Sequence, residues 1–203
     1  LRQLPFTLTG AQQRAIDEIL ADLTKGAPMN RLVQGDVGSG KTMVAAAAAY
    51  CAARNGCQTA LMAPTEILAE QHYASLSGLF ASLGISVALL TGSMAQKEKK
   101  AVREGLQEGT IQIAVGTHAL ISDSTVFQNL GLVITDEQHR FGVGQRSKLS
   151  AKGADPHLLV MSATPIPRTL ALLMYGDLDV SVLDQLPPGR QVVDTFLVGE
   201  SYR

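Results

Sequence analysis

The sequence predicts an α/β domain of three layers, in which a mainly parallel sheet is covered by helices on both faces. Three observations support this prediction. Short apolar runs alternate with longer segments of helical character along the 203 residues. The runs are continuous rather than alternating in polarity, as is typical of strands buried on both faces. A glycine-rich stretch, residues 35–42, follows the first run and precedes an alanine-rich segment that favours a helix.

The expected elements follow from this pattern, taken in chain order. Strands are expected at residues 31–34, 58–63, 85–90, 111–115, 132–135 and 157–161, with a further strand beginning at 191–196. Helices are expected at residues 11–23, 43–54, 67–83, 96–108 and 167–175. The regular alternation of the two element types favours parallel strands joined by helical crossovers.

The glycine-rich stretch fits the phosphate-binding pattern G-x-x-x-x-G-K-[ST]. Glycines let the backbone curl around an anion, and the freed N–H groups and the helix N-terminus then face phosphate groups. In this pattern the lysine reaches the β- and γ-phosphates of ATP, and the hydroxyl of the last residue holds Mg²⁺. The nucleotide-binding candidates are Gly35, Asp36, Val37, Gly38, Ser39, Gly40, Lys41 and Thr42.

The first helix has two readings at its start. Thr9 is the expected N-cap, and Gln12 three residues later completes a capping box. Alternatively, Gln12 recognises adenine while Phe6 stacks on the base. The residues alone do not choose between these two roles.

Polar clusters follow the predicted strands, and in a parallel sheet they meet at the carboxyl edge where ligands bind. The clusters are Pro64-Thr65-Glu66, Thr91-Gly92, Gly116-Thr117-His118, Asp136-Glu137 and Ser162-Ala163-Thr164. We expect all of them to share one edge with the glycine-rich loop.

The acidic pair at the end of an apolar strand has the Walker B arrangement. Asp136 is expected to hold Mg²⁺, and Glu137 to orient the attacking water, so Lys41, Asp136 and Glu137 are the catalytic candidates and Thr42 and Asp136 the metal ligands. The plainer reading is a helix-capping acidic pair.

Hydroxyl groups at the same edge are candidates for coupling or for contacts with a nucleic-acid backbone. Ser162 and Thr164 stand beside the expected γ-phosphate, and Thr65, Thr91 and Thr117 are neutral donors to phosphate oxygens. Ordinary strand-to-helix caps and turn chemistry explain the same residues equally well.

Composition sets broad limits. The net charge of −1 offers no bulk positive field for nucleic acid, so DNA binding must come from local sites. Cys51 and Cys57 are expected to be small core residues of a reducing compartment, and the four histidines have no metal-ligand spacing. Lys97, Lys99 and Lys100 are interpreted as a solvated helix face. No apolar run is long enough for a membrane span, and we expect a cytoplasmic protein.

Taken together, the motifs resemble the first RecA-like motor domain of superfamily 2 helicases, from Phe6 to about Arg190. Phe6, Thr9 and Gln12 resemble the adenine-recognition motif, residues 35–42 motif I, and residues 63–68 motif Ia. Thr91-Gly92 and Gly116-Thr117-His118 resemble DNA-backbone motifs, Asp136-Glu137-Gln138-His139 resembles motif II, and Ser162-Ala163-Thr164 resembles motif III.

The finer match, at residues 136–146 and 161–169, is similar to the RecG family of branched-DNA translocases and close to the Mfd family. Gln138 favours RecG. The resemblance implies ATP, Mg²⁺, and translocation on branched double-stranded DNA, such as forks and Holliday junctions, during repair and recombination. It also implies an N-terminal wedge domain and a second RecA-like domain with an arginine finger, neither of which is expected within this sequence.

These implications set the expected domain boundaries: residues 1–185 form the motor domain, and residues 186–203 form a linker and the start of the second motor domain. Because the chain starts with a leucine, we expect a piece of a longer protein. An isolated motor domain is expected to hydrolyse ATP poorly, since an arginine finger supplies roughly 10³–10⁵-fold in rate. The alternatives are an Mfd or PriA-like motor domain, a P-loop kinase, and a nucleotide-gated binding module without turnover.

Overall fold

A computed structural model describes residues 8–136, 148–164 and 178–185. The helices are α1 (Gly10–Leu23), α2 (Lys41–Arg54), α3 (Glu66–Ala81), α4 (Gln96–Gln107) and the short 3₁₀ helix η1 (His118–Leu120). The strands are β1 (Asn30–Gly35), β2 (Gln58–Met62), β3 (Val87–Leu90), β4 (Ile113–Gly116), β5 (Leu130–Asp136), β6 (His157–Ser162) and β7 (Asp179–Leu183).

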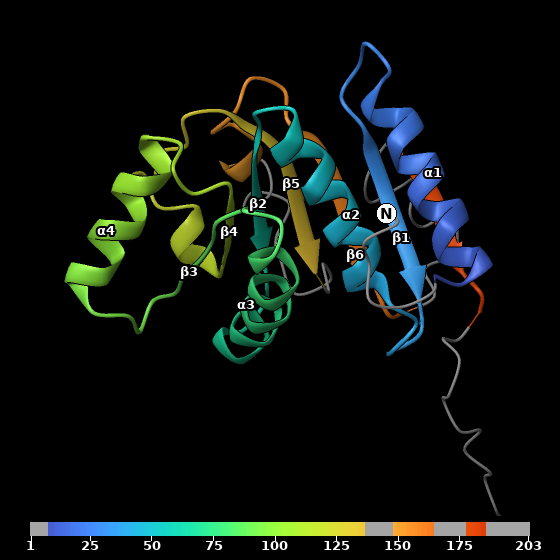
Figure 1. The fold of residues 1–203 in the computed structure, drawn as a ribbon, viewed down its shortest axis with the longest axis horizontal. Helices are drawn as coiled ribbons and strands as arrows, with labels where there is room; N and C mark the ends of the chain where they lie inside the picture. The colour runs from blue at the N-terminus through green and yellow to red at the C-terminus, as the bar shows by residue number, and fades with distance from the viewer. Residues whose placement is uncertain (1–7, 137–147, 165–177, 186–203) are drawn as a thin grey trace, which may run out of the picture.

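The strands form one sheet in the order β3-β4-β2-β5-β6-β1-β7. Every strand pair among the described residues is parallel. Figure 1 shows the arrows of β1 and β5 pointing the same way, so their carboxyl ends lie at the same side of the molecule. The predicted parallel α/β sheet is confirmed.

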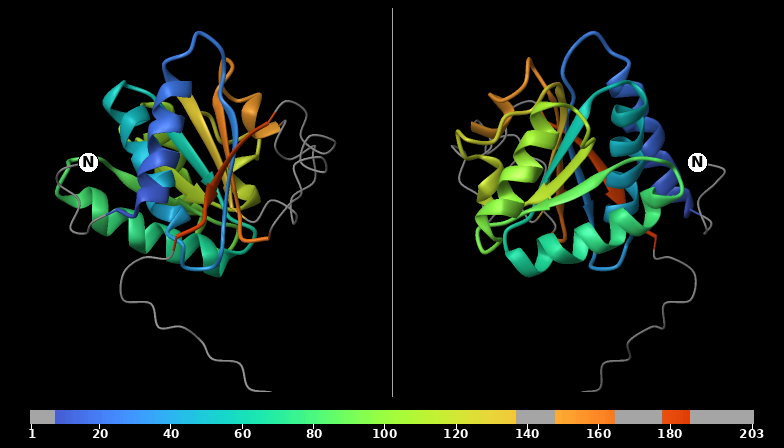
Figure 2. Two further views of the ribbon diagram at one scale, coloured as in Figure 1. Left: turned by 90° about the vertical axis from the view of Figure 1, so that its right-hand side faces the viewer. Right: turned by 60° about the vertical axis from the view of Figure 1, so that its left-hand side comes forward.

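Helices cover both faces of this sheet, as predicted. One face packs its apolar side chains, including those of Leu61 and Ile134, against α1, α2 and α3. The other face packs residues such as Met62 and Val133 against Leu106 of α4 and against η1. Neighbouring positions of one strand thus serve opposite cores, which explains why the strands read as continuous apolar runs. Figure 2 shows the helices on either side of the sheet.

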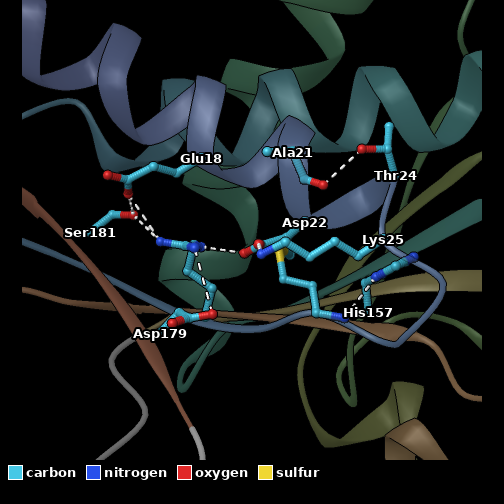
Figure 3. A network of polar contacts seen from close by, with 10 residues as sticks. Glu18, Ala21, Asp22, Thr24, Lys25, His157, Asp179 and Ser181 are labelled. Atoms are coloured by element: carbon cyan, nitrogen blue, oxygen red, sulfur yellow. Dashed lines mark hydrogen bonds and ion pairs between the residues drawn. The ribbon is translucent and has the colours of Figure 1, made fainter.

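A buried arginine joins α1, β1 and β7. Arg31 on β1 has a side chain that is 8% exposed, and its Nε donates to Oδ2 of Asp22 at 2.7 Å. Its Nη1 donates to Ser181 Oγ at 2.9 Å and to Glu18 Oε2 at 3.0 Å. Figure 3 shows Glu18, Asp22, Asp179 and Ser181 surrounding the guanidinium group. A buried cation with this many acceptors fixes the sheet edge against α1.

The structure corrects the sequence prediction at β7 and at Lys99, and two further expected elements lie outside the described residues. The sequence reading missed β7, which forms an edge strand beside β1. It also placed Lys99 on a solvated face, whereas this lysine is 9% exposed and its Nζ donates to the Gly92 carbonyl. The aliphatic part of the Lys99 side chain is buried while its ammonium group donates to a carbonyl, so the burial costs little free energy. The expected elements at residues 167–175 and 191–196 lie outside the described residues.

The remaining compositional expectations have simple outcomes. Cys51 and Cys57 are both free and half-buried, not fully buried core residues. Among the described ranges, no helix combines the length and apolar character that crossing a membrane requires.

Candidate functional site: the phosphate loop and the carboxyl edge of the sheet

The glycine-rich stretch forms the connection between β1 and α2. Gly38 and Gly40 adopt left-handed conformations, with φ of 80° and 87°. A Cβ at Gly40 would lie 2.1 Å from Nε2 of Gln12, and one at Gly35 would lie 2.6 Å from Oγ of Ser39. Side chains are therefore excluded on both conformational and steric grounds, and the loop backbone stays open at the N-terminus of α2.

Lysine and hydroxyl groups fit a phosphate ligand at this loop. The Lys41 ammonium donates to the carbonyls of Gly35 at 2.6 Å and Asp36 at 3.0 Å, which fixes a positive charge at the loop. Thr42 lies in the first turn of α2. Ser39 is fully buried, and its Oγ has no hydrogen-bond partner among the described residues. These donors and the glycine geometry suit a polyphosphate.

Gln12 connects α1 to the loop. Its Oε1 accepts from the Thr9 N–H at 3.0 Å, and the Thr9 hydroxyl accepts from the Gln12 N–H at 3.2 Å, so the predicted capping box is confirmed. In addition, Nε2 of Gln12 donates to the Ser39 carbonyl at 2.8 Å. The side chain is thus both a helix cap and a support of the loop. Its proposed contact with adenine remains a prediction, and Phe6 lies outside the described residues.

Asp136 ends β5 at the carboxyl edge and is 8% exposed. Its Oδ2 lies 2.7 Å from Nε2 of His72, a residue of α3. This partner was missed, because His72 was considered only as a possible metal ligand. A usable signal existed: Ala69, His72, Leu76 and Phe80 form the buried stripe of α3, and a buried imidazole requires a partner. Glu137 lies outside the described residues.

The hydroxyl pair at the end of β6 is preorganised. Ser162 Oγ and Thr164 Oγ1 are 2.9 Å apart, and the Thr164 N–H donates to Ser162 Oγ at 3.2 Å. This local bonding supports the turn-and-cap reading of the pair. Because β6 lies between β1 and β5, Ser162 also lies between the phosphate loop and Asp136.

The clusters after β2, β3 and β4 come together as expected. Oε1 of Glu66 accepts from the Ser93 N–H at 3.0 Å, which joins the start of α3 to the turn after β3. Hydrogen bonds from Ser93 lower the pKa of the Glu66 carboxyl below its usual value. A Cβ at Gly92 would lie 3.5 Å from Cε1 of His118, so the turn after β4 is also in contact.

Exposure differs among these candidates. Thr65, Gly92 and His118 are exposed, whereas Pro64 is half-buried. The buried members are Thr91, Gly116 and Thr117. Thr65 caps α3 by accepting from the Leu68 N–H at 3.3 Å, as its plainer reading predicts. The surface presented by this cluster is therefore made by exposed backbone and by Thr65 and His118.

The strand register brings the ends of these strands to the same edge of the sheet. Gln34 of β1 pairs with Ser162, Asp136 pairs with Met161, and Met62 pairs with both Thr135 and Gly116. Adjacent strands are about 4.8 Å apart, so the phosphate-loop strand lies roughly 10 Å from β5 and roughly 19 Å from β4. One continuous edge thus carries the glycine-rich loop toward one end and the Glu66–Ser93 cluster toward the other.

Other candidates lie elsewhere. His157 is at the opposite, amino edge of the sheet, where its Nδ1 accepts from the Met29 N–H at 2.9 Å, and burial lowers its pKa. Within the described ranges, no cluster of three His, Cys, Asp or Glu side chains is arranged to hold a metal by itself.

The chain is 58% identical to the ATP-dependent DNA helicase RecG of Aquifex aeolicus, with all of this chain and 26% of that protein covered. It is also 58% identical to RecG of Bacillus subtilis, with 98% of this chain and 29% of that protein covered. The chain thus spans between a quarter and a third of the length of these relatives.

Structural comparison agrees. A solved structure of RecG bound to a three-way DNA junction superposes with a TM-score of 0.82 at 52% identity, covering 95% of this chain and 26% of that one. The family model described as DEAD/DEAH box helicase matches residues 9–173, which include the phosphate loop, Asp136 and Ser162. This chain therefore belongs to the DEAD/DEAH box helicase family.

Proposed function

We propose that this chain is the ATP-binding motor domain of a DNA helicase or translocase that couples ATP hydrolysis to movement on branched double-stranded DNA. Fork regression and branch migration in repair and recombination are the proposed activities, and the cytoplasm is the proposed location. One observation carries the proposal: the glycine-rich loop with Lys41, the acid Asp136 and the Glu66–Ser93 cluster lie along one sheet edge. The RecG relatives favour this assignment over an Mfd or PriA-like motor domain.

We assign the ATP site to the loop between β1 and α2. Residues 35–42 would hold the phosphates, with Lys41 offsetting their charge and Gln12 supporting the loop through Ser39. The hydroxyl of Thr42 and the carboxylate of Asp136 are hard oxygen donors that suit Mg²⁺. When bound, Mg·ATP supplies the activated phosphoryl group. Glu137 is assigned to orient water, and Phe6 to stack on the base.

We assign DNA contacts to the other end of the same edge. The exposed residues Thr65, Gly92 and His118 offer hydroxyl, backbone N–H and imidazole donors, which suit phosphate oxygens without a bulk positive field. Ser162 and Thr164 stand between the two ends and would report nucleotide state. Residues 1–185 are proposed as the motor domain. Residues 186–203 would lead to a second RecA-like domain of the same protein, and a wedge domain would precede the chain.

The test is a nucleotide-binding titration combined with ATP hydrolysis, with and without a three-way DNA junction. The chain is expected to bind Mg·ATP but to turn it over slowly, because an arginine finger from a second domain contributes roughly 10³–10⁵-fold. Lys41→Ala should abolish binding, whereas Glu137→Gln should keep binding and abolish the residual turnover.

Two results would contradict the proposal in different ways. Failure of the folded chain to bind ATP would refute the motor assignment altogether. Fast junction-stimulated hydrolysis that Glu137→Gln abolishes would keep the motor assignment but show that one domain holds the complete active site. Slow turnover that rises when the second motor domain is supplied would support both parts.

A further inference from the structure

A histidine from a neighbouring helix holds the acid at the end of β5. Nε2 of His72 lies 2.7 Å from Oδ2 of Asp136, and both side chains are 11% exposed. The two residues are 64 positions apart in the chain. This is a close, nearly water-free contact, so it fixes the orientation of the carboxylate.

The contact uses one side of the carboxylate. A carboxylate has two oxygens with about four acceptor positions, and His72 occupies one position on Oδ2. Asp136 stands beside Met161 in the sheet, one residue before Ser162. Because the two oxygens belong to one rigid carboxylate group, the hydrogen bond from His72 to Oδ2 also sets the direction in which Oδ1 points. Carboxylates that bind metals are commonly hydrogen-bonded to such an outer partner.

The helix that supplies His72 also begins at the other candidate surface. Thr65 caps α3, and Glu66 in its first turn accepts from the Ser93 N–H. His72 follows Thr65 by seven positions, which at 1.5 Å per residue is about 10 Å along the helix axis. In both views of Figure 2, α3 runs along the lower side of the molecule, toward which the strands point in Figure 1. Helix α3 therefore supplies Glu66 to the Glu66–Ser93 cluster and His72 to the contact with Asp136.

We propose that His72 is a positioning residue for the nucleotide-bound metal: it orients the Asp136 carboxylate and ties it to α3. This inference rests on the proposed ATP site and deepens it. In this role His72 would not itself bind substrate or metal. It acts through Asp136, and it gives the Glu66–Ser93 cluster a direct mechanical connection to the metal ligand.

The test compares two amide substitutions of the whole 203-residue chain. In His72→Gln the amide nitrogen reaches approximately the position of Nε2 and can donate to Asp136 Oδ2. In His72→Asn the amide is one methylene shorter and cannot reach it. Both variants keep a polar, neutral donor, so they differ in reach rather than in chemistry. Circular dichroism and thermal melts establish that each variant is folded.

The measurement is binding of ADP in the presence of Mn²⁺, followed by the electron paramagnetic resonance signal of the ion. We expect His72→Asn to weaken Mn²⁺ binding to the ADP complex by about 10-fold, the lower end of the usual effect of an outer partner. His72→Gln should stay within about 3-fold of the unmodified chain because the hydrogen bond is restored. ADP affinity in EDTA should be equal in all variants.

A matched control separates positioning from loss of stability. Leu76→Ala removes a fully buried side chain one turn beyond His72 in α3. It should lower the melting temperature at least as much as His72→Asn while leaving Mn²⁺ affinity unchanged. Equal weakening of Mn²⁺ binding by Leu76→Ala would overturn the inference, since any loosening of α3 would then suffice.

Other outcomes are equally decisive. If the unmodified chain does not bind ADP, the proposed function fails. If it binds Mn²⁺·ADP and His72→Asn binds it equally well, the proposed function stands and the positioning role is refuted. Tighter Mn²⁺ binding by His72→Asn would also refute it, because His72 would then compete with the metal for Asp136.

Discussion

The Arg31–Asp22 pair offers the sharpest test of what holds the N-terminal helix to the sheet. Replacing Arg31 by Met preserves much of the side-chain volume but leaves the Asp22 carboxylate, whose side chain is 5% exposed, with Lys25 as its one remaining cation in the described residues. Removing one partner of a buried pair costs about 3–5 kcal/mol. The side chains of Glu18 and Asp179 are 48% and 65% exposed, so losing the ion pair of each with Arg31 adds less than about 1 kcal/mol.

The assay is urea denaturation of the chain at pH 7, followed by circular dichroism. Arg31→Met should lower the unfolding free energy by about 3–5 kcal/mol, which corresponds to roughly 10 °C in melting temperature for a chain of this size. The matched control is Arg14→Met, which breaks an ion pair whose side chains are 57% and 62% exposed. That variant should change stability by less than about 1 kcal/mol.

A double variant shows whether the cost comes from the stranded charge. Arg31→Met combined with Asp22→Leu removes both charges, and its stability should recover to near that of the unmodified chain, because apolar replacements of buried pairs are often neutral. A loss of less than about 1 kcal/mol in Arg31→Met alone would refute the reasoning. So would a double variant whose loss equals the sum of the two single losses.

Acid provides a second readout of the same pair. Burial raises the pKa of Asp22, but hydrogen bonds and the charges of Arg31 and Lys25 outweigh it and hold the pKa below its ordinary value of 3.8. A lowered folded-state pKa adds stability that is present above pH 3.8 and is lost as the pH falls through the folded-state value. This loss should be present in the unmodified chain and absent from the double variant.

Three further predictions concern the carboxyl edge. Gly40→Ala places a Cβ at φ +87° and within 2.1 Å of Gln12 Nε2, so ATP affinity measured by titration should fall at least about 10-fold. Gln12→Ala removes the buried side chain that donates to the Ser39 carbonyl, so the chain should lose about 1–3 kcal/mol of unfolding free energy in urea denaturation. This loss does not depend on which nucleotide is used. If this variant prefers ATP over GTP as strongly as the unmodified chain does, that result would count against a contact of Gln12 with adenine. Glu66→Ala should speed hydrogen exchange of the Ser93 amide, with that of Leu61 in β2 unchanged as an internal control.

The sheet and its edge were predictable from the sequence because local signals and topology agreed. The motif at residues 35–42 fixed one strand end, and buried apolar runs fixed the others, so a parallel sheet brought the polar clusters to one edge. The capping box at Thr9 was also predictable, since its two hydrogen bonds depend on residues three positions apart.

The parts that escaped prediction depend on partners that belong to other elements of the fold. In β7 the polar Ser181 is buried because it accepts from Arg31, whereas the apolar Val182 is 52% exposed, so polarity gives the reverse of the actual burial. Lys99 reads as a surface charge because its acceptor, the Gly92 carbonyl, belongs to a turn before the helix. The His72–Asp136 contact similarly joins a helix to a strand far along the chain.

Helix α1 connects the phosphate loop to the end of β7 through two further hydrogen bonds. The Gln12 side chain bonds to the Ser39 carbonyl, and the neighbouring Ala11 N–H donates to Oε1 of Gln185 at 3.1 Å. Both bonds come from the first turn of one 14-residue helix. A ligand that moves Ser39 must therefore break the bond to Gln12 or carry the first turn of α1 with it. In the second case Gln185, the last residue of the proposed motor domain, is displaced as well. The phosphate loop and Gln185 are thus joined through the first turn of a single helix.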